Sequence, residues 1–152
     1  MAIGLVGSEM CIRDSSLRAV CNLGIINGYS FTVDCDVLEA DGGTRTASIN
    51  GAWIALNDTF TKMVNENKLV QNPFTCKVGA ISVGIVGGEL VADLDYAKDS
   101  NAEVDLNLVL DEKFEILEIQ GTAEGKPFSK DSLDSLFNIA KECVQEIFKI
   151  QN

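Results

Sequence analysis

The stretch FTVDCDVLEADGGTRTASINGAWIALNDTF, Phe31 to Phe60, changes its hydrophobic period half-way along. In its first part Phe31, Val33, Cys35 and Val37 alternate with polar residues. That period of two predicts a strand with one buried face.

After two glycines the apolar residues recur at intervals of three and four, at Ile49, Trp53, Leu56, Phe60 and Met63. This spacing predicts an amphipathic helix from about Thr44 to Glu66. Gly51 lies inside it, at a cost of about 1 kcal/mol relative to alanine. We therefore expect Gly51 to pack closely against a neighbour.

The junction between strand and helix reads Gly43-Thr44-Arg45. A helix start has unpaired N–H groups and the positive end of the dipole, and glycine lets an anion approach the backbone. Thr44 can cap the helix or donate its hydroxyl, and arginine can bind two phosphate oxygens at once. The junction therefore predicts either a phosphate site or a capped helix in which Arg45 pairs with a nearby carboxylate: Asp36, Glu39 or Asp41.

Outward from this helix, the C-terminal half contains four apolar segments that predict strands: 80–86, 89–97, 104–110 and 114–125. Gly87-Gly88 predicts a two-residue hairpin turn, and we expect the four strands in meander order. A final helix should begin after Ser129 as N-cap. Upstream, residues 16–23 read as the end of a helix. The element order predicts an α+β fold.

A second polar constellation lies in ADLDYAKDSNAEVD, residues 92–105, with carboxylates at Asp93, Asp95, Asp99, Glu103 and Asp105. Asp93 and Asp95 are two apart on an expected strand and should share a face. Oxygen ligands in this number suit Mg²⁺ or Mn²⁺. The alternative is a solvated acidic rim on a hairpin. An anion site together with a cation site would suit phosphoryl chemistry.

Composition narrows the function classes. The net charge is −11, from 23 acids and 12 bases, which disfavours a general nucleic-acid or membrane-surface binder. The chain has no histidine, so a Ser-His-Asp triad and a His-zinc site are excluded. The five cysteines lack C-x-x-C spacing, which favours reduced thiols in a cytoplasmic protein. No apolar run reaches the ~20 residues of a membrane span.

The opening segment, Met1 to Ser15, has no sustained hydrophobic period. Its ending, GSEMCIRDS, is similar to a tail joined to many unrelated environmental sequences, as translated adapter DNA would be. We expect residues 1–15 to be foreign or disordered.

From Ser16 onward the chain closely resembles the C-terminal part of bacterial ribonuclease PH, a family of phosphate-dependent 3′ exoribonucleases that trim tRNA precursors. The segments that carry the resemblance are Ser16–Val20, Thr32–Leu56, Asn72–Val109 and Glu118–Ser129. The resemblance implies two lobes of the ribosomal protein S5 domain 2-like fold, with residues 16–72 as the remainder of the first lobe and residues 73–152 as the second. It also implies a homo-hexameric ring, a trimer of dimers, that works on RNA in the cytoplasm.

The family's phosphate-binding Gly-Thr-Arg triplet corresponds to Gly43, Thr44 and Arg45. Its two metal-binding and catalytic aspartates correspond to Asp93 and Asp99, and Asp95 and Asp105 match acidic positions nearby. The implied cofactor is Mg²⁺ or Mn²⁺, and inorganic phosphate is the co-substrate.

The family chain is longer at its N-terminus, where it carries most of the first lobe, a second phosphate-binding arginine and basic RNA contacts. The chain as written is therefore expected to be inactive and poorly folded alone. The competing interpretation of the sequence is a non-catalytic RNA-binding subunit of a ring.

Overall fold

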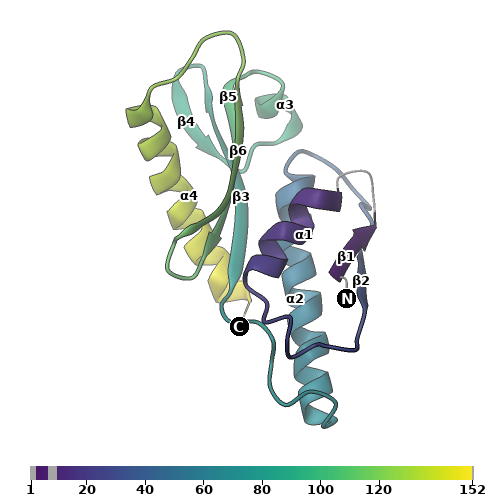
Figure 1. Ribbon diagram of the computed structural model, residues 1–152. Helices are drawn as coiled ribbons and strands as arrows, with labels where there is room; N and C mark the ends of the chain where they lie inside the picture. Colours follow the sequence, from purple (N-terminus) through teal and green to yellow (C-terminus); the bar gives the residue numbers. More distant parts are fainter. Residues whose placement is uncertain (1–2, 7–9, 152) are drawn as a thin grey trace.

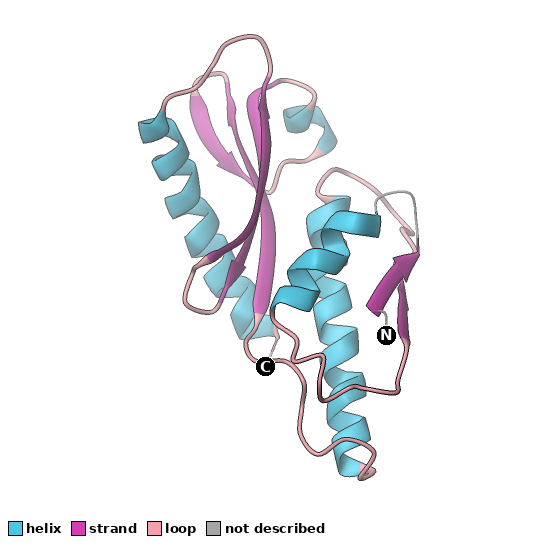
Figure 2. Cartoon of the chain, in the orientation of Figure 1, coloured by secondary structure: helices cyan, strands magenta, loops and turns pink. Residues whose placement is uncertain are grey.

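The fold is a four-stranded antiparallel sheet with one helix on one face and two helices on the other (Figure 1). The computed structural model describes residues 3–6 and 10–151. In chain order the elements are β1 (Ile3–Val6), α1 (Met10–Ala19), β2 (Phe31–Asp34), α2 (Thr44–Asn65), β3 (Val78–Val86), β4 (Glu89–Ala92), α3 (Tyr96–Asp99), β5 (Ala102–Asp111), β6 (Ile116–Ala123) and α4 (Lys130–Ile150). Figure 2 shows β1 and β2 as a separate short ribbon beyond α1 and α2. The expected α+β class is confirmed.

The sheet order is β4-β3-β5-β6, so the expected meander order is wrong. The Gly87-Gly88 turn does form the hairpin of β3 and β4, with both glycines at positive φ. However, β4 pairs with β3 over four residues only. The long strand β5 instead pairs with β3 along nearly its whole length. Two long, buried strands gain more from pairing with each other than either would from the short β4, which is left at the edge.

One face of the sheet is covered by α4. Ser129 caps this helix as expected, since its hydroxyl accepts a hydrogen bond from Ser132 N–H at 3.1 Å. The apolar stripe of α4 packs on alternate residues of the strands. The buried members of this cluster are Ile81, Val83, Val104, Leu106, Leu108, Leu110, Leu136, Ala140 and Val144.

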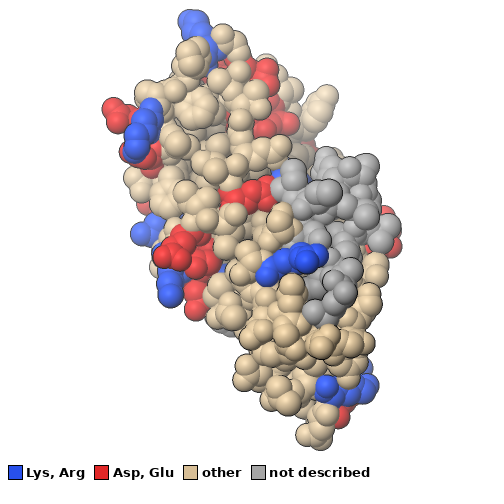
Figure 3. All heavy atoms as spheres, in the orientation of Figure 1, with Lys and Arg blue, Asp and Glu red and all other residues tan. Residues whose placement is uncertain are grey.

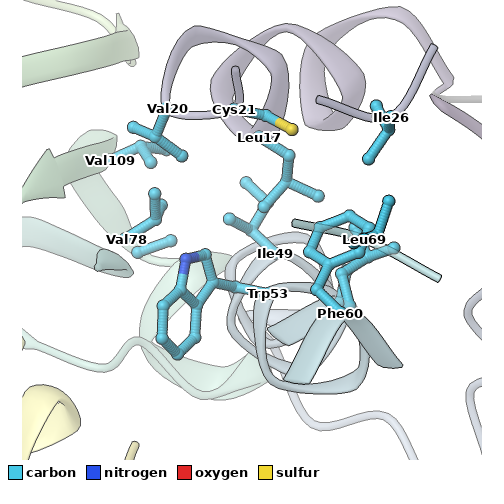
Figure 4. Close-up of a cluster of buried hydrophobic side chains, with 13 residues drawn as sticks. Leu17, Val20, Cys21, Ile26, Ile49, Trp53, Phe60, Leu69, Val78 and Val109 are labelled. Carbon is cyan, nitrogen blue, oxygen red and sulfur yellow. The ribbon is translucent and has the colours of Figure 1, made fainter. Parts of the chain in front are cut away.

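The opposite face supplies Val78, Ala80 and Val109 to a second cluster, together with side chains of α1 and α2 (Figure 4). The helix residues expected to face a core do so: Ile49, Trp53, Leu56 and Phe60 are buried, and Met63 is partly buried. A single core therefore joins the two helices to the sheet, and it holds the start of α2 against the sheet surface.

Two sequence expectations near α2 are wrong. Gly51 is exposed, and a Cβ placed on it would meet nothing within 4 Å, so no close packing explains it. Val37 is 51% exposed, because β2 ends at Asp34 and the chain then leaves the core. Phe31, Val33 and Cys35 do pack against the cluster, as the alternation predicts.

The side chain of Asn50 fixes α2 to the strand β3. Its amide nitrogen donates to the carbonyl of Ala80 and its amide oxygen accepts from the N–H of Ala80, both at 2.8 Å. Because β4 reaches only as far as Val83 along β3, no strand in the described part of the chain pairs with Ala80 on that side. The Asn50 amide takes the place of the missing strand.

The first fifteen residues lie partly outside the described part of the chain, which omits residues 1–2 and 7–9. Within it, β1 runs parallel to β2, and α1 begins at Met10. Neither observation tests the foreign origin of residues 1–15, nor the division at residues 72 and 73, and both stay predictions. Among the described residues, no helix combines the length and apolar character that crossing a bilayer requires.

Candidate functional site

A small polar cavity of about 110 Å³ lies where the start of α2 meets the sheet. Figure 1 shows α3 close to the end of α2 that the loop from β2 enters, and the cavity lies in this region. Its lining is Gly43, Thr44, Arg45, Ser82, Leu94, Asp99, Asp105 and Asn107. A water occupies about 30 Å³ in the liquid, so this space suits a small hydrated ion or one tetrahedral oxyanion.

Position 42 requires glycine, because the backbone of another segment approaches it closely. Its φ is +84°, and a Cβ there would lie 2.1 Å from the carbonyl oxygen of Leu94. The adjacent Asp41 carboxylate accepts a hydrogen bond from Tyr96 N–H at 3.2 Å. The loop before α2 is therefore held against the turn between β4 and α3, which brings the two polar constellations of the sequence together.

The first turn of α2 faces the cavity without a side-chain cap. Gly43 is the N-cap residue, in a left-handed conformation, and no side chain caps the helix there. Thr44 is thus not the cap. The carbonyl of Gly43 accepts from Ala47 N–H at 2.9 Å and from the Thr46 hydroxyl at 2.9 Å. N–H groups of a first turn lack partners within the helix, so this end favours an anion.

Arg45 pairs with Glu118 of β6, which corrects the expectation of a local partner among Asp36, Glu39 and Asp41. The guanidinium Nη2 donates to Oε1 of Glu118. The other carboxylate oxygen, Oε2, accepts from the Ser16 hydroxyl of α1 at 2.9 Å. The Arg45 and Glu118 side chains are 15% and 16% exposed, so this contact is largely shielded from solvent.

The aspartates that line the cavity are not the pair that the sequence predicted. Asp99, at the end of α3, and Asp105, on β5, both line the cavity. Asp93 is not part of the lining, although its Oδ1 lies 3.6 Å from where a Cβ of Gly43 would be. Asp93 and Asp95 do not share a strand face, because β4 ends at Ala92 and Asp93 turns the chain with a φ of +55°.

Asp95 has a structural role instead. It caps α3 by accepting from Lys98 N–H at 2.8 Å, and it pairs with the Lys98 ammonium at 2.5 Å. The Lys98 hydrogen bonds, from side chain and backbone, lower the pKa of the Asp95 carboxyl. The segment Tyr96–Asp99 is one turn of helix, although the sequence predicted its first two residues at the end of a strand.

Asp105 is the carboxylate whose surroundings suit a cation best. Partial burial, followed by the charges of Asp99 and Glu124, raises the pKa of Asp105 above its ordinary range. A bound cation would relieve that repulsion. No three acidic or cysteine side chains of the described residues converge as a metal cluster. Two carboxylates and the Asn107 amide beside an anion site still fit Mg²⁺, which usually keeps several waters.

Sequence reasoning did not single out Ser82, Asn107 or Glu118. The first two could have been found, because Asp105 and Asn107 alternate with the apolar residues of β5 and Ser82 pairs with Asn107 in the sheet. Ser82 is buried, and its hydroxyl accepts from Leu94 N–H at 3.1 Å. No local sequence pattern marks Glu118 as a site residue, because its partner Arg45 lies 73 residues away in the sequence.

A larger cavity of about 490 Å³ lies between α2 and the segment that follows β2. Its lining includes Asp34, Asp36 and Glu39 and, among the described residues, neither lysine nor arginine. On the face drawn in Figure 3, acidic and basic side chains are interspersed, with no continuous basic stripe across the described residues. This cavity is therefore a poor surface for RNA phosphates.

Comparison with known families finds a match in the second half of the chain. Residues 76–143 match the model of the "3′ exoribonuclease family, domain 2". This part of the chain carries β3 to β6 and most of α4, together with Asp99 and Asp105. The second half of the chain is thus similar to this domain.

Solved structures share the fold over nearly the whole chain. Rrp46 of rice (Oryza sativa) matches with a TM-score of 0.76 at 16% identity, over 96% of this chain. The exosome of Archaeoglobus fulgidus, solved with RNA bound to the active site, matches with a TM-score of 0.76 at 18% identity, over 93% of this chain. An archaeal exosome core matches with a TM-score of 0.74 at 16% identity, over 99% of this chain. The chain spans 65%, 59% and 67% of those proteins, respectively.

Proposed function

We propose that this chain is the C-terminal part of a phosphate-dependent 3′ exoribonuclease of the ribonuclease PH type. One observation carries the proposal: Gly43, Thr44 and Arg45 share a single cavity with Asp99 and Asp105. The helix start and the arginine suit an oxyanion, and the carboxylates suit a cation. The family match of residues 76–143 supports the reaction class.

In the proposed reaction, an oxygen of inorganic phosphate attacks the phosphorus of the last phosphodiester of the RNA. The bond from that phosphorus to the preceding 3′ oxygen breaks, and the 3′ oxygen takes up a proton. The product is a nucleoside diphosphate whose β-phosphate comes from inorganic phosphate. Such transfers need positioning and charge neutralisation more than a covalent nucleophile, which agrees with a chain that has no histidine.

Arg45 and the first-turn N–H groups of α2 would hold the attacking phosphate and orient it. Asp99 and Asp105 would hold the divalent cation, and the Asn107 amide lines the same cavity. When bound, that cation, Mg²⁺ or Mn²⁺, neutralises charge on the phosphate oxygens. Asp93 stays a predicted catalytic and metal residue from the resemblance, beside Gly43 but outside the cavity lining.

The proposal gives Arg45 and the aspartates different roles, which variants of each can distinguish. The kinetic experiments use the full-length enzyme that carries this sequence. Arg45→Ala should raise the phosphate concentration for half-maximal rate by about tenfold, because it removes a charged fork for oxyanions. Arg45→Lys keeps the charge without the fork and should lie between wild type and Arg45→Ala.

Asp99→Asn should lower turnover by about a hundredfold and leave RNA binding intact, because it removes a cation ligand only. The matched control is Asp131→Asn, an exposed aspartate in the first turn of α4. Loss of RNA binding in Asp99→Asn would contradict the role proposed for Asp99.

The finer features follow the resemblance and are part of the proposal: tRNA precursors as substrates, a homo-hexameric ring and a cytoplasmic location. The second candidate is a non-catalytic RNA-binding ring subunit, because the structural matches include exosome structures. Against it stand the phosphate triplet and both cavity carboxylates, all present here. RNA binding without phosphate-dependent shortening would favour the second candidate.

A further inference from the structure

The contact between Arg45 and Glu118 joins the proposed phosphate-binding side chain to a strand of the second half of the chain. Arg45 is in the first turn of α2, where its side chain could reach solvent in many conformations. Here Nη2 is bound by Glu118 instead. A guanidinium has five N–H donors in a rigid plane, so one bound nitrogen restricts the direction of the others.

The carboxylate of Glu118 is itself held by a second helix. Ser16 is 2% exposed, and its hydroxyl donates to Oε2 at 2.9 Å. Oε1 and Oε2 are thus bound by different helices, α2 and α1. Because both oxygens are occupied, Glu118 cannot easily rotate away from Arg45, and Arg45 cannot easily leave the cavity wall.

Glu118 also lies on the correct surface of the sheet. It stands opposite Val109 in the pairing of β5 with β6, and Asn107 and Asp105 follow Val109 on the same face at steps of two. Glu118 is not part of the cavity lining, whereas Arg45 is. The carboxylate therefore binds Arg45 from outside the cavity and leaves the remaining N–H groups for a ligand inside it.

We propose that Glu118 is a positioning residue, which fixes the guanidinium of Arg45 for phosphate through a contact supported by Ser16. The proposal rests on the phosphate site proposed above. A carboxylate near an anion site also repels the anion, so its presence costs affinity unless the ordering of Arg45 outweighs the repulsion. The shielded geometry and the double hydrogen bonding of Glu118 favour ordering as the larger effect.

The test titrates the full-length enzyme that carries this sequence with inorganic phosphate at constant ionic strength and follows the backbone amides of Gly43, Thr44 and Arg45 by NMR. Glu118→Ala should weaken phosphate binding by about tenfold, as loss of a hydrogen bond to a charged group does. Glu118→Gln retains an acceptor for Nη2 and should recover most of the affinity. The control Glu115→Ala removes an exposed carboxylate just before β6.

Ser16→Ala leaves the charge pair intact and should weaken binding by a smaller factor, about twofold to threefold. It keeps the inference testable if Glu118→Ala does not fold. In parallel, the Arg45 Nε–H signal should broaden or exchange faster in Glu118→Ala than in wild type, without any phosphate present.

Three outcomes are decisive. Weaker binding in Glu118→Ala with recovery in Glu118→Gln supports the inference. Equal or tighter binding in Glu118→Ala overturns it and makes Glu118 a competitor of phosphate, while the phosphate site stands if Arg45→Ala still loses binding. No saturable phosphate binding by the wild-type chain overturns the phosphate site itself, and the inference with it.

Discussion

At the scale of single residues, the decisive feature is how closely two loops approach each other. Gly42 and Gly43 directly precede the predicted helix, and the sequence alone explains them by the access that they give an anion to the backbone. The structure adds a steric reason for Gly42, whose Cα faces the carbonyl of Leu94. That contact could not be predicted, because it depends on where a segment 52 residues further along the chain passes.

Gly42→Ala should therefore destabilise the fold by ~3 kcal/mol, since it combines positive φ with a clash against backbone. Gly28→Ala is the matched control: φ is +92° there, but nothing lies within 4 Å of the added Cβ, so it should cost ~1 kcal/mol. Urea unfolding of both variants measures the difference. Equal losses would show that the approach to Leu94 is not tight.

The buried thiol of Cys21 makes a prediction about pH. Burial raises its pKa above the ordinary value of 9.0. The folded state therefore favours the neutral thiol, and its contribution to stability is present below pH 9.0 and is lost as the pH rises, because the unfolded chain releases the proton first. The measurement is the urea midpoint of unfolding at neutral pH and again about one pH unit above 9.0. The decrease of the midpoint between these two pH values should be smaller in Cys21→Ala than in wild type. An identical fall in both proteins would contradict this assignment.

At the scale of elements, the sequence predicted helices better than strand order. The apolar spacing gave α2 almost to the residue, because a helix is defined by neighbours three and four positions away. Strand pairing is set by partners that local spacing does not reveal. The four segments were therefore found, but the pairing of β3 with β5 was not. The turn after β4 was misassigned for the same reason, since Asp93 leaves the strand where its partner continues.

The contact between α2 and β3 depends on Asn50. Asn50→Ala would leave both polar groups of Ala80 without a partner and should cost ~2 kcal/mol of unfolding free energy. Asp58→Ala, on the exposed side of the same helix, should cost little. Chemical denaturation gives both values. A loss below ~0.5 kcal/mol for Asn50→Ala would show that water replaces the amide at no cost.

At the scale of the whole molecule, the core around α1 and α2 includes Val78, Ala80 and Val109 from the sheet. The division near residue 72 stays a prediction, but side chains from both sides of it meet in this core. The sequence could identify the apolar side chains on each side of that division but not that they meet. For the same reason, Gly43 to Arg45 could be selected from the sequence, while Glu118 and the exact set of aspartates could not.

This shared core predicts that both halves of the chain unfold together. Val109 is 1% exposed, and Val109→Ala should lower the unfolding free energy by ~2 kcal/mol in both halves. Trp53 fluorescence reports on the helix side, and amide hydrogen exchange in α4 reports on the sheet side. Val70→Ala, at an 89% exposed valine, is the control. A shift of the Trp53 transition without a change in α4 would contradict a shared core.

The central claim is that the Gly43–Arg45 and Asp99–Asp105 site carries out phosphorolysis. The most direct measurement is to incubate the full-length enzyme containing this sequence with a short RNA, Mg²⁺ and ³²P-labelled inorganic phosphate, and to separate the nucleotide products. The account predicts that the label appears in the β-phosphate of nucleoside diphosphates, in step with shortening from the 3′ end. RNA shortening that releases monophosphates, while the label stays in free phosphate, would contradict it.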